Sequence, residues 1–141
     1  MPYGGIFPRQ HDNINQVEKQ NMAKVLIVDD SPTEVHIFSM ALGDEGYQVV
    51  VATDGEEGVQ KATEEMPDLI LMDVVMPGLN GFQATRKIHR NASTKHIPII
   101  IVTTKDQDTD REWGMRQGAK DYLVKPVDVA QLLSKVGELV G

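Results

Sequence analysis

Cysteine is missing from this chain of 141 residues, so neither a disulfide framework nor a thiolate metal site is available to it. Long apolar runs are missing too, since none approaches the roughly 18 residues that a membrane-spanning helix requires. The first residues also lack the basic-then-apolar layout of a signal peptide. These absences predict a cytoplasmic protein that does not insert into a membrane.

Basic residues are scarce relative to acidic ones. Lys and Arg number 14 against 21 Asp and Glu, which gives a net charge of −7. A nucleic-acid-binding surface needs clustered positive charge, so this balance argues against a nucleic-acid partner. A short basic cluster does occur at Arg86, Lys87, His89 and Arg90. A solvated helix face is its ordinary explanation, and docking of a partner is the alternative.

The chain is long enough for one domain with one core. Residues 1–21 are predicted to be a flexible N-terminal tail, because they contain two prolines and two glycines followed by a polar stretch without periodicity. The domain is predicted to span residues 22–141. No output domain is expected after it, because the sequence stops in or just after the last predicted helix.

Short apolar runs alternate with stretches of helical length. The runs are rich in Val, Ile and Leu, which is typical of parallel strands buried on both faces, and they span residues 24–28, 47–52, 69–72, 97–102 and 122–124. Ser31 before Pro32, and Asp54 before Glu57, predict two helix starts. Because parallel strands need crossover connections, the pattern predicts an α/β fold, a three-layer α/β/α sandwich around a five-stranded parallel sheet.

Polar residues stand where four of these runs stop. They are Asp29 with Asp30, then Asp73, Thr103 and Lys125. Ligands of open α/β sheets bind at the carboxyl ends of the strands, so these side chains are expected to meet at one rim. Taken singly, each has a commoner structural explanation: a helix N-terminus, a strand-end hydroxyl or a surface lysine. Their joint position at strand ends favours a functional site.

The predicted site suits metal-assisted phosphoryl transfer. Three neighbouring carboxylates stay ionised together only with a cation among them, and Mg²⁺, or Mn²⁺, prefers such oxygen ligands. An Asp carboxylate such as Asp73 can act as a nucleophile and form an aspartyl phosphate. Lys125 and Thr103 would then bind the phosphoryl oxygens.

From Ala23 to its end, the sequence resembles the response-regulator receiver domains of two-component signalling. The resemblance rests on Asp29-Asp30, the stretch 72–81, Thr103 and Lys125-Pro126. It implies a flavodoxin-like sheet with strand order 2-1-3-4-5. It also implies a protein that is not an enzyme with a separate substrate, beyond its own phosphorylation and dephosphorylation.

The resemblance assigns roles to the acidic residues. Asp73 would accept the phosphoryl group. Asp30 and Asp73 would bind Mg²⁺ directly together with the main-chain carbonyl of Val75, and Asp29 would act through a bound water.

It also implies a switch. Lys125 would bind the phosphoryl group, and the Lys125–Pro126 peptide bond would be cis. Thr103 would move toward the phosphoryl oxygens and Tyr122 would fill the space that it leaves. The fourth helix, fifth strand and fifth helix would then form the surface for a downstream protein.

Partners follow from the same resemblance. The donor would be a phosphohistidine on a sensor histidine kinase of the chemotaxis type. The segments 81–86, 103–107 and 113–119 are most similar to single-domain regulators of type IV pilus (twitching) systems. A monomer is expected, which either binds a target or acts as a phosphate sink. Trp113, on the predicted fourth helix, is expected to pack on the core, with a place on the output face as the alternative.

The sequence departs from many chemotaxis regulators beside the acceptor. Val74 and Val75 stand where Trp and Asn are common, and Lys105 stands where an acid is common. In the family these positions border the path of the attacking water, so they bear on the lifetime of the phosphorylated form.

Three other functions would use a similar set of residues or a similar fold. A phosphatase of the haloacid-dehalogenase type needs its nucleophile after the first strand and a second Asp two residues later. Here the first strand is followed by Asp29-Asp30-Ser31, and the residue two after Asp73 is Val75. A nucleotide-binding flavodoxin-like module would need a glycine-rich phosphate loop after the first strand. A degenerate structural receiver is disfavoured because every core site residue is present.

Overall fold

The computed structural model describes residues 23–140, and the predicted tail lies outside them. Its elements in chain order are β1 (Lys24–Val28), α2 (Pro32–Asp44), β2 (Gln48–Ala52), α3 (Gly55–Glu65), β3 (Leu69–Met72), α4 (Gly81–Arg90), β4 (Ile99–Thr103), α5 (Asp108–Gln117), β5 (Asp121–Val124) and α6 (Val129–Val140).

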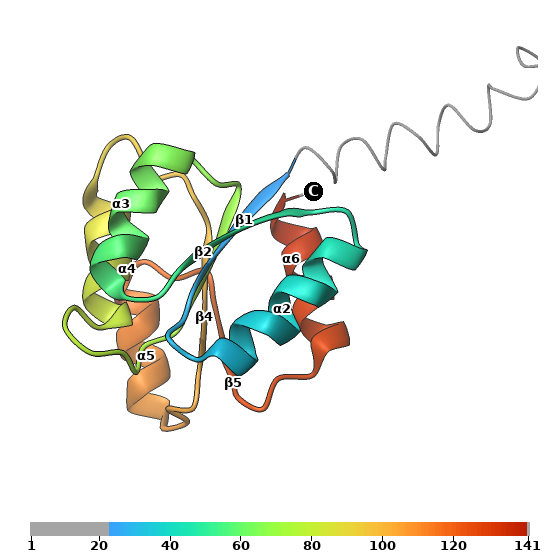
Figure 1. Ribbon diagram of the computed structural model, residues 1–141. Helices are drawn as coiled ribbons and strands as arrows, with labels where there is room; N and C mark the ends of the chain where they lie inside the picture. Colours follow the sequence, from blue (N-terminus) through green and yellow to red (C-terminus); the bar gives the residue numbers. More distant parts are fainter. Residues whose placement is uncertain (1–22, 141) are drawn as a thin grey trace, which may run out of the picture.

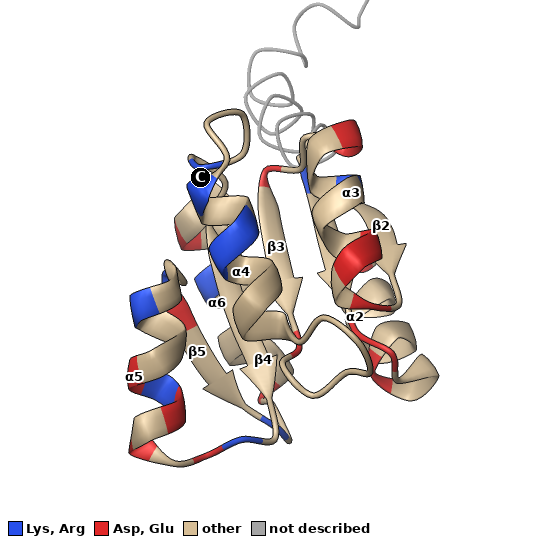
Figure 2. Cartoon of the chain, turned by 90° about the vertical axis from the view of Figure 1, so that its left-hand side faces the viewer, with Lys and Arg blue, Asp and Glu red and all other residues tan. Residues whose placement is uncertain are grey.

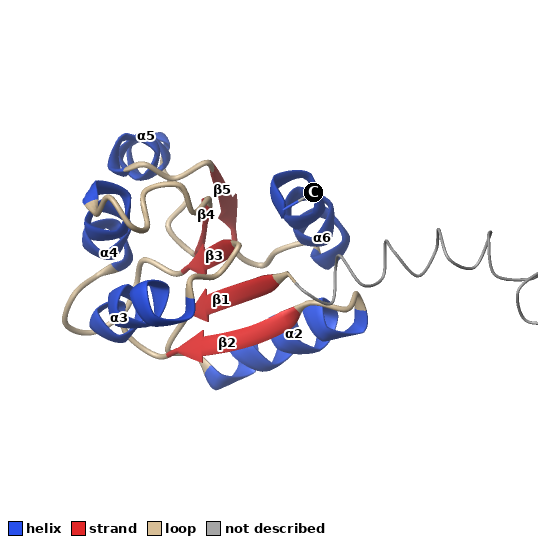
Figure 3. Ribbon diagram, turned by 90° about the horizontal axis from the view of Figure 1, so that it is seen from above, coloured by secondary structure: helices blue, strands red, loops and turns tan. Residues whose placement is uncertain are grey.

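The strands form one parallel sheet in the order β2-β1-β3-β4-β5, as predicted. Helices α3, α4 and α5 cover one face of this sheet, and α2 and α6 cover the other (Figures 1 and 3). The three-layer α/β/α sandwich is therefore confirmed.

The apolar core lies on both faces of the sheet because side chains of a strand point alternately to its two sides. In β1, Val25 and Ile27 belong to the cluster that includes buried residues of α2 and α6. Leu26 and Val28 belong to the cluster on the side of α3 and α4. Burial on both faces explains why the sequence shows continuous apolar runs rather than alternation.

The two predicted helix starts are present. The Ser31 hydroxyl accepts a hydrogen bond from the Glu34 N–H at 3.4 Å, and the Asp54 carboxylate accepts one from the Glu57 N–H at 2.8 Å. These caps satisfy N–H groups that have no partner within the helix. They place α2 and α3 directly after the ends of β1 and β2.

Four strand boundaries differ slightly from the predicted ones: both ends of β4 and the starts of β2 and β5, with β4 ending at Thr103 and β5 beginning at Asp121. Strand β4 begins at Ile99 rather than at residue 97, because Pro98 has no N–H and Ile97 donates its N–H to the Thr94 carbonyl in the preceding turn. Strand β2 begins one residue later than predicted. Within residues 23–140, no helix combines the length and apolar character needed to cross a membrane.

Candidate active site at the carboxyl ends of the strands

The register of the sheet brings the predicted residues together. Val28 of β1 pairs with Met72 of β3, so Asp29 and Asp73 leave the sheet side by side. The Asp73 N–H donates to the Val28 carbonyl at 2.9 Å and continues the ladder by one step. Two acids that are far apart in the sequence are thus held at neighbouring strand ends by main-chain hydrogen bonds.

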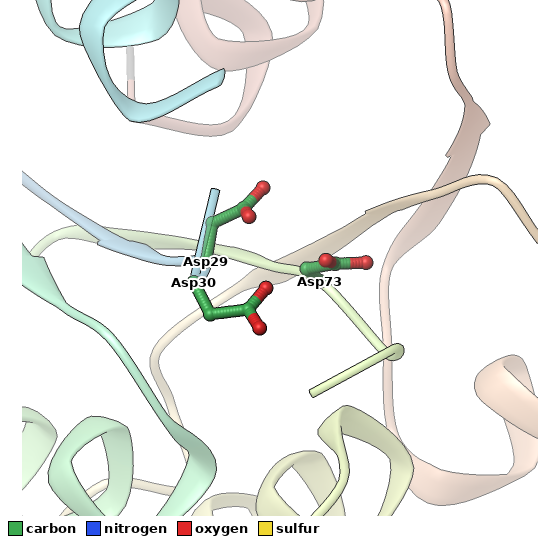
Figure 4. A group of neighbouring side chains, drawn as sticks. All are labelled: Asp29, Asp30 and Asp73. Carbon is green, nitrogen blue, oxygen red and sulfur yellow. The ribbon is translucent and has the colours of Figure 1, made fainter. Parts of the chain in front are cut away.

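Three carboxylates cluster at this rim. Asp29, Asp30 and Asp73 each offer an oxygen within 4.8 Å of the others (Figure 4). Asp29 and Asp73 are buried, with 3% and 6% of their surface exposed, whereas Asp30 is exposed. Because Mg²⁺ favours carboxylate oxygens and retains several waters, a donor set that is open on one side fits this ion.

Lys125 supplies the positive charge beside the buried acids. Its ammonium lies 2.7 Å from Asp29 Oδ2 and 3.7 Å from Asp73 Oδ2. Burial by itself would lower the pKa of Lys125, but the hydrogen bond to Asp29 and the charge of Asp73 outweigh it and raise that pKa. The lysine therefore stays protonated and neutralises part of the acidic cluster.

The Asp73 carboxylate has two unlike oxygens. Oδ1 accepts the main-chain N–H groups of Val74 at 2.7 Å and Val75 at 3.3 Å. Oδ2 faces Lys125. Burial raises the pKa of Asp73, the Lys125 charge opposes this, and the Asp29 carboxylate adds to the rise. The carboxylate is thus oriented by its own main chain and balanced between a cation and an anion.

Thr103 and Lys125 end neighbouring strands. Thr103 of β4 pairs with Val124 of β5, and the Lys125 N–H donates to the Thr103 carbonyl at 2.8 Å. Thr103 is fully buried, its hydroxyl accepts the Lys105 N–H at 3.5 Å, and its proximity to Asp73 acts to lower the pKa of that acid, against the larger effect of burial. The Lys125–Pro126 bond is cis, as predicted.

The Tyr122 ring already lies in the buried position that the switch hypothesis assigns to it after Thr103 moves. We expected its ring to move inward after Thr103 shifts, but it is already 2% exposed and its hydroxyl donates to the Lys105 carbonyl at 2.8 Å. The ring has room because Gly114 of α5 has no side chain: a Cβ there would lie 3.1 Å from the ring. The inward position of Tyr122 thus depends on the space that Gly114 leaves.

Substitution Tyr122→Phe is expected to remove a tyrosine ionisation near pH 12. Burial, with a smaller contribution from Asp110, raises the pKa of Tyr122 to about 12, against about 10 in an unfolded chain. The folded protein holds this proton more tightly, so the wild type should lose stability as the pH rises from about 10 toward 12. The variant should lose less over that window.

This prediction is checked by tyrosinate absorbance during an alkaline titration and by urea unfolding at several pH values. At neutral pH the variant should be less stable by about 1 kcal/mol, because the Lys105 carbonyl loses its donor. An equal loss of stability in both proteins between about pH 10 and 12 would mean that the pKa of Tyr122 is the same in the folded and the unfolded chain.

Sequence reasoning missed three residues that shape the site. Gly81 begins α4 against the acceptor, since a Cβ there would lie 2.0 Å from the Asp73 carbonyl oxygen. Arg111 donates from α5 to the Tyr122 carbonyl at 3.2 Å. Gly114 makes room for the Tyr122 ring. An isolated glycine inside a helical pattern is a signal for close packing, and it could have identified Gly114.

Trp113 does not pack on the core as expected. It is 49% exposed and lies beside Phe82 and Gln83 of α4 in a surface hollow between α4 and α5. The core position under α5 is taken by the adjacent Gly114, which packs against Tyr122. Val75, two residues after the buried Asp73, is also exposed, at 51%.

Comparisons with known sequences agree with this geometry. The family model of the response regulator receiver domain matches residues 25–137. Protein PilH of Pseudomonas aeruginosa is 56% identical over 119 residues, which cover 84% of this chain and 98% of PilH. Response regulator PleD of Caulobacter vibrioides is 39% identical over 117 residues, which are 83% of this chain but 26% of PleD.

Solved structures share the fold. Chemotaxis protein CheY4 of Vibrio cholerae is 36% identical with a TM-score of 0.79, over 84% of this chain and 98% of CheY4. The receiver domain of the sensor histidine kinase PA1611 from Pseudomonas aeruginosa, solved with a magnesium ion coordinated in its active site cleft, is 34% identical with a TM-score of 0.79. It is matched over 98% of its length and 84% of this chain. With an acidic cluster, a lysine and a threonine placed at these strand ends, this chain belongs to the response regulator receiver domain family.

Proposed function

We propose that this protein accepts a phosphoryl group onto Asp73 from a chemotaxis-type histidine kinase, in a Mg²⁺-dependent reaction in the cytoplasm. The observation that carries the proposal is the position of Asp73, whose Oδ2 lies 3.7 Å from the Lys125 ammonium within a cluster of three carboxylates. The similarity to PilH supports a role in pilus-based motility or a chemotaxis-like pathway.

The reaction follows from the groups at the site. Asp73 Oδ2 would attack the phosphorus of a phosphohistidine, so that a P–O bond forms, the P–N bond breaks and the imidazole leaves. Lys125 and the Thr103 hydroxyl would bind phosphoryl oxygens as charge spreads over them. Asp29, Asp30, Asp73 and the Val75 carbonyl would hold Mg²⁺, which neutralises the added negative charge. Later hydrolysis of the aspartyl phosphate would reset the protein without any separate substrate.

Phosphorylation is proposed to act through a population shift. The phosphoryl group adds about −1.5 to −2 of charge beside Thr103. A hydroxyl drawn toward it would favour the inward Tyr122 that the structure already shows, rather than create that position. The downstream target would read the face formed by α5, β5 and α6, with the protein acting as a monomer. Removal of phosphoryl groups from a shared kinase is the second way in which the same chemistry would signal.

The test is intact mass after incubation with Mg²⁺ and acetyl phosphate, for the wild type and for Asp73→Asn. The wild type should gain one phosphoryl group, and the gain should vanish in the variant or with a chelator. Transfer from the phosphohistidine domain of a chemotaxis-type kinase then tests the donor. If neither donor labels the wild type, and if beryllofluoride with Mg²⁺ leaves the amide NMR spectrum of the protein unchanged, the proposal fails. Turnover of a free phosphate ester would instead indicate a phosphatase.

A further inference from the structure

The outer face of α4 carries positive charge in an otherwise acidic protein. Residues 74–105 contain no Asp or Glu at all, although the chain has 21. In Figure 2 the ribbon of α4 is coloured for basic residues and not for acidic ones, whereas the ribbons of α3 and α5 both contain acidic positions. The segment thus departs from the composition of the rest of the chain.

The charged residues of α4 share one face. Gln83, Arg86, Lys87 and Arg90 are all exposed, and their spacing places them on neighbouring turns of one side of the helix. Within residues 23–140, none of these three cations has a carboxylate within ion-pair distance. Cations elsewhere do form such pairs, namely Lys24, Lys61, Arg111, Arg116, Lys125 and Lys135.

The face is hollowed rather than flat. An open hollow of about 570 Å³ is lined by Gln83, Arg86, Lys87, Arg90 and Asn91. A second hollow of about 260 Å³ is lined by Asn80, Phe82, Gln83, Arg86, Trp113 and Gln117. The two hollows adjoin, because Gln83 and Arg86 line both of them, and we call the combined depression the basic groove. One end of the groove is cationic, and the other has the half-exposed indole of Trp113.

The walls of the groove are held rigidly. His89 of α4 packs onto Gly118 at the end of α5, where a Cβ would lie 2.4 Å from the imidazole ring. The Asn80 side chain and Gln83 also form a reciprocal capping box that fixes the start of α4. The helix backbones beneath the groove are therefore held in place, which limits the backbone entropy that the protein would lose on binding a ligand.

We infer that the basic groove binds an acidic segment of a partner protein, with its carboxylates on Arg86, Lys87 and Arg90 and an apolar side chain against Trp113. Unpaired arginines beside an exposed aromatic are the composition that protein interfaces favour. A long polyanion fits less well, because the neighbouring α3 has four glutamates and the whole chain carries −7. The inference concerns the face of α4, and it does not require phosphorylation of Asp73.

The experiment uses the unphosphorylated protein and a synthetic helical peptide with glutamates on one face and one phenylalanine. A control peptide, called the glutamine twin below, has glutamine in place of every glutamate. Amide chemical shifts of the isotope-labelled protein should move along α4 and at the Trp113 indole with the acidic peptide and not with the twin. Raising the salt concentration should weaken the effect, because exposed charges are screened.

Two matched double variants test the residues. Arg86→Glu with Arg90→Glu should weaken binding at least about tenfold, since attraction becomes repulsion at two contacts. Lys95→Glu with Lys120→Glu changes the net charge by the same amount at exposed sites outside the groove. Binding should stay within about twofold of the wild type, because the residues that line the groove are unchanged and distant exposed charges are screened. Trp113→Ala should also weaken binding of the acidic peptide. Circular dichroism and urea unfolding are compared across all variants, so that a folding defect is recognised without any phosphorylation.

Several results would overturn the inference. They are the absence of shifts, equal shifts with the glutamine twin, or equal losses in the two double variants. A single-stranded RNA or phosphatidylglycerol vesicles that bound more tightly through the same arginines would reassign the groove to another class of polyanion. Failure of Asp73 phosphorylation would affect only the proposed function, because the peptide experiment is done without it.

Discussion

Replacing Lys125 by Met should lower the free energy of unfolding by about 3–5 kcal/mol at neutral pH, because breaking a buried ion pair leaves an uncompensated charge. The ammonium lies 2.7 Å from Asp29 Oδ2, and the lysine and aspartate side chains are 9% and 4% exposed. Without it, Asp29 and Asp73 face each other with only main-chain donors as partners. Urea unfolding in the presence of a chelator measures the loss.

Mg²⁺ should recover part of that loss. An ion that binds the folded state alone stabilises it by an amount that grows with the logarithm of its affinity, and three carboxylates without a competing ammonium should bind Mg²⁺ more tightly. The rise in melting temperature on adding Mg²⁺ should therefore be larger in the variant than in the wild type. An equal or smaller rise would mean that Lys125 does not compete with the metal.

Lys135→Met is the matched control. Lys135 also pairs with an aspartate, Asp121, at 3.2 Å, but its side chain is 36% exposed. Such pairs contribute about 0–1 kcal/mol, so this variant should change stability little. If Lys125→Met cost no more than Lys135→Met, the cation beside the acidic cluster would have no structural role.

Gly81→Ala is expected to be nearly as damaging, although it adds one methyl group. The new Cβ would lie 2.0 Å from the Asp73 carbonyl oxygen and 2.8 Å from Val74 Cα. Main-chain atoms cannot rotate away, so the start of α4 or the segment after β3 must move. We expect a loss of about 3 kcal/mol, the upper part of the usual range for overpacking. Phosphoryl uptake should fall by about 100-fold if Asp73 shifts by 1 Å.

Gly137→Ala supplies the opposite expectation. Gly137 lies inside α6, and a Cβ there would meet no atom within 4 Å. Alanine in a helix interior is favoured over glycine by about 0.5–1 kcal/mol, so this variant should be more stable than the wild type. Both variants replace glycine by alanine, but the urea concentration at the unfolding midpoint should fall for Gly81→Ala and rise for Gly137→Ala. Equal behaviour would contradict the close packing at Gly81.

The strand ends could be predicted because each one is a local event in the sequence. An apolar run that stops at an acid, a threonine or a lysine marks where a buried strand leaves the sheet, as at Asp73 and Lys125. Parallel strands end on the same edge, so topology alone brings such residues to one rim. Helix starts at Ser31 and Asp54 were predictable for the same reason, since a cap involves residues only three apart.

Distances between side chains were not predictable in this way. That Lys125 hydrogen-bonds Asp29 and lies further from Asp73 depends on how β5 packs beside β4 and on the burial of all three groups. The inward Tyr122 depends on a space under Gly114, which belongs to another element. Trp113 illustrates the same limit, because it was expected on the core, whereas the adjacent Gly114 is the residue of α5 that packs there against Tyr122.

Composition, strand ends and motif residues thus predicted the fold and the acidic cluster around Asp73, because these features are local in the sequence. Packing established the rest: which carboxylate the lysine pairs with, where the tyrosine rests, why Gly81 and Gly114 admit no side chain, and that the cations of α4 border a groove with Trp113. These properties arise where elements distant in the sequence meet, and they depend on distances of a few tenths of an ångström that a linear pattern does not contain.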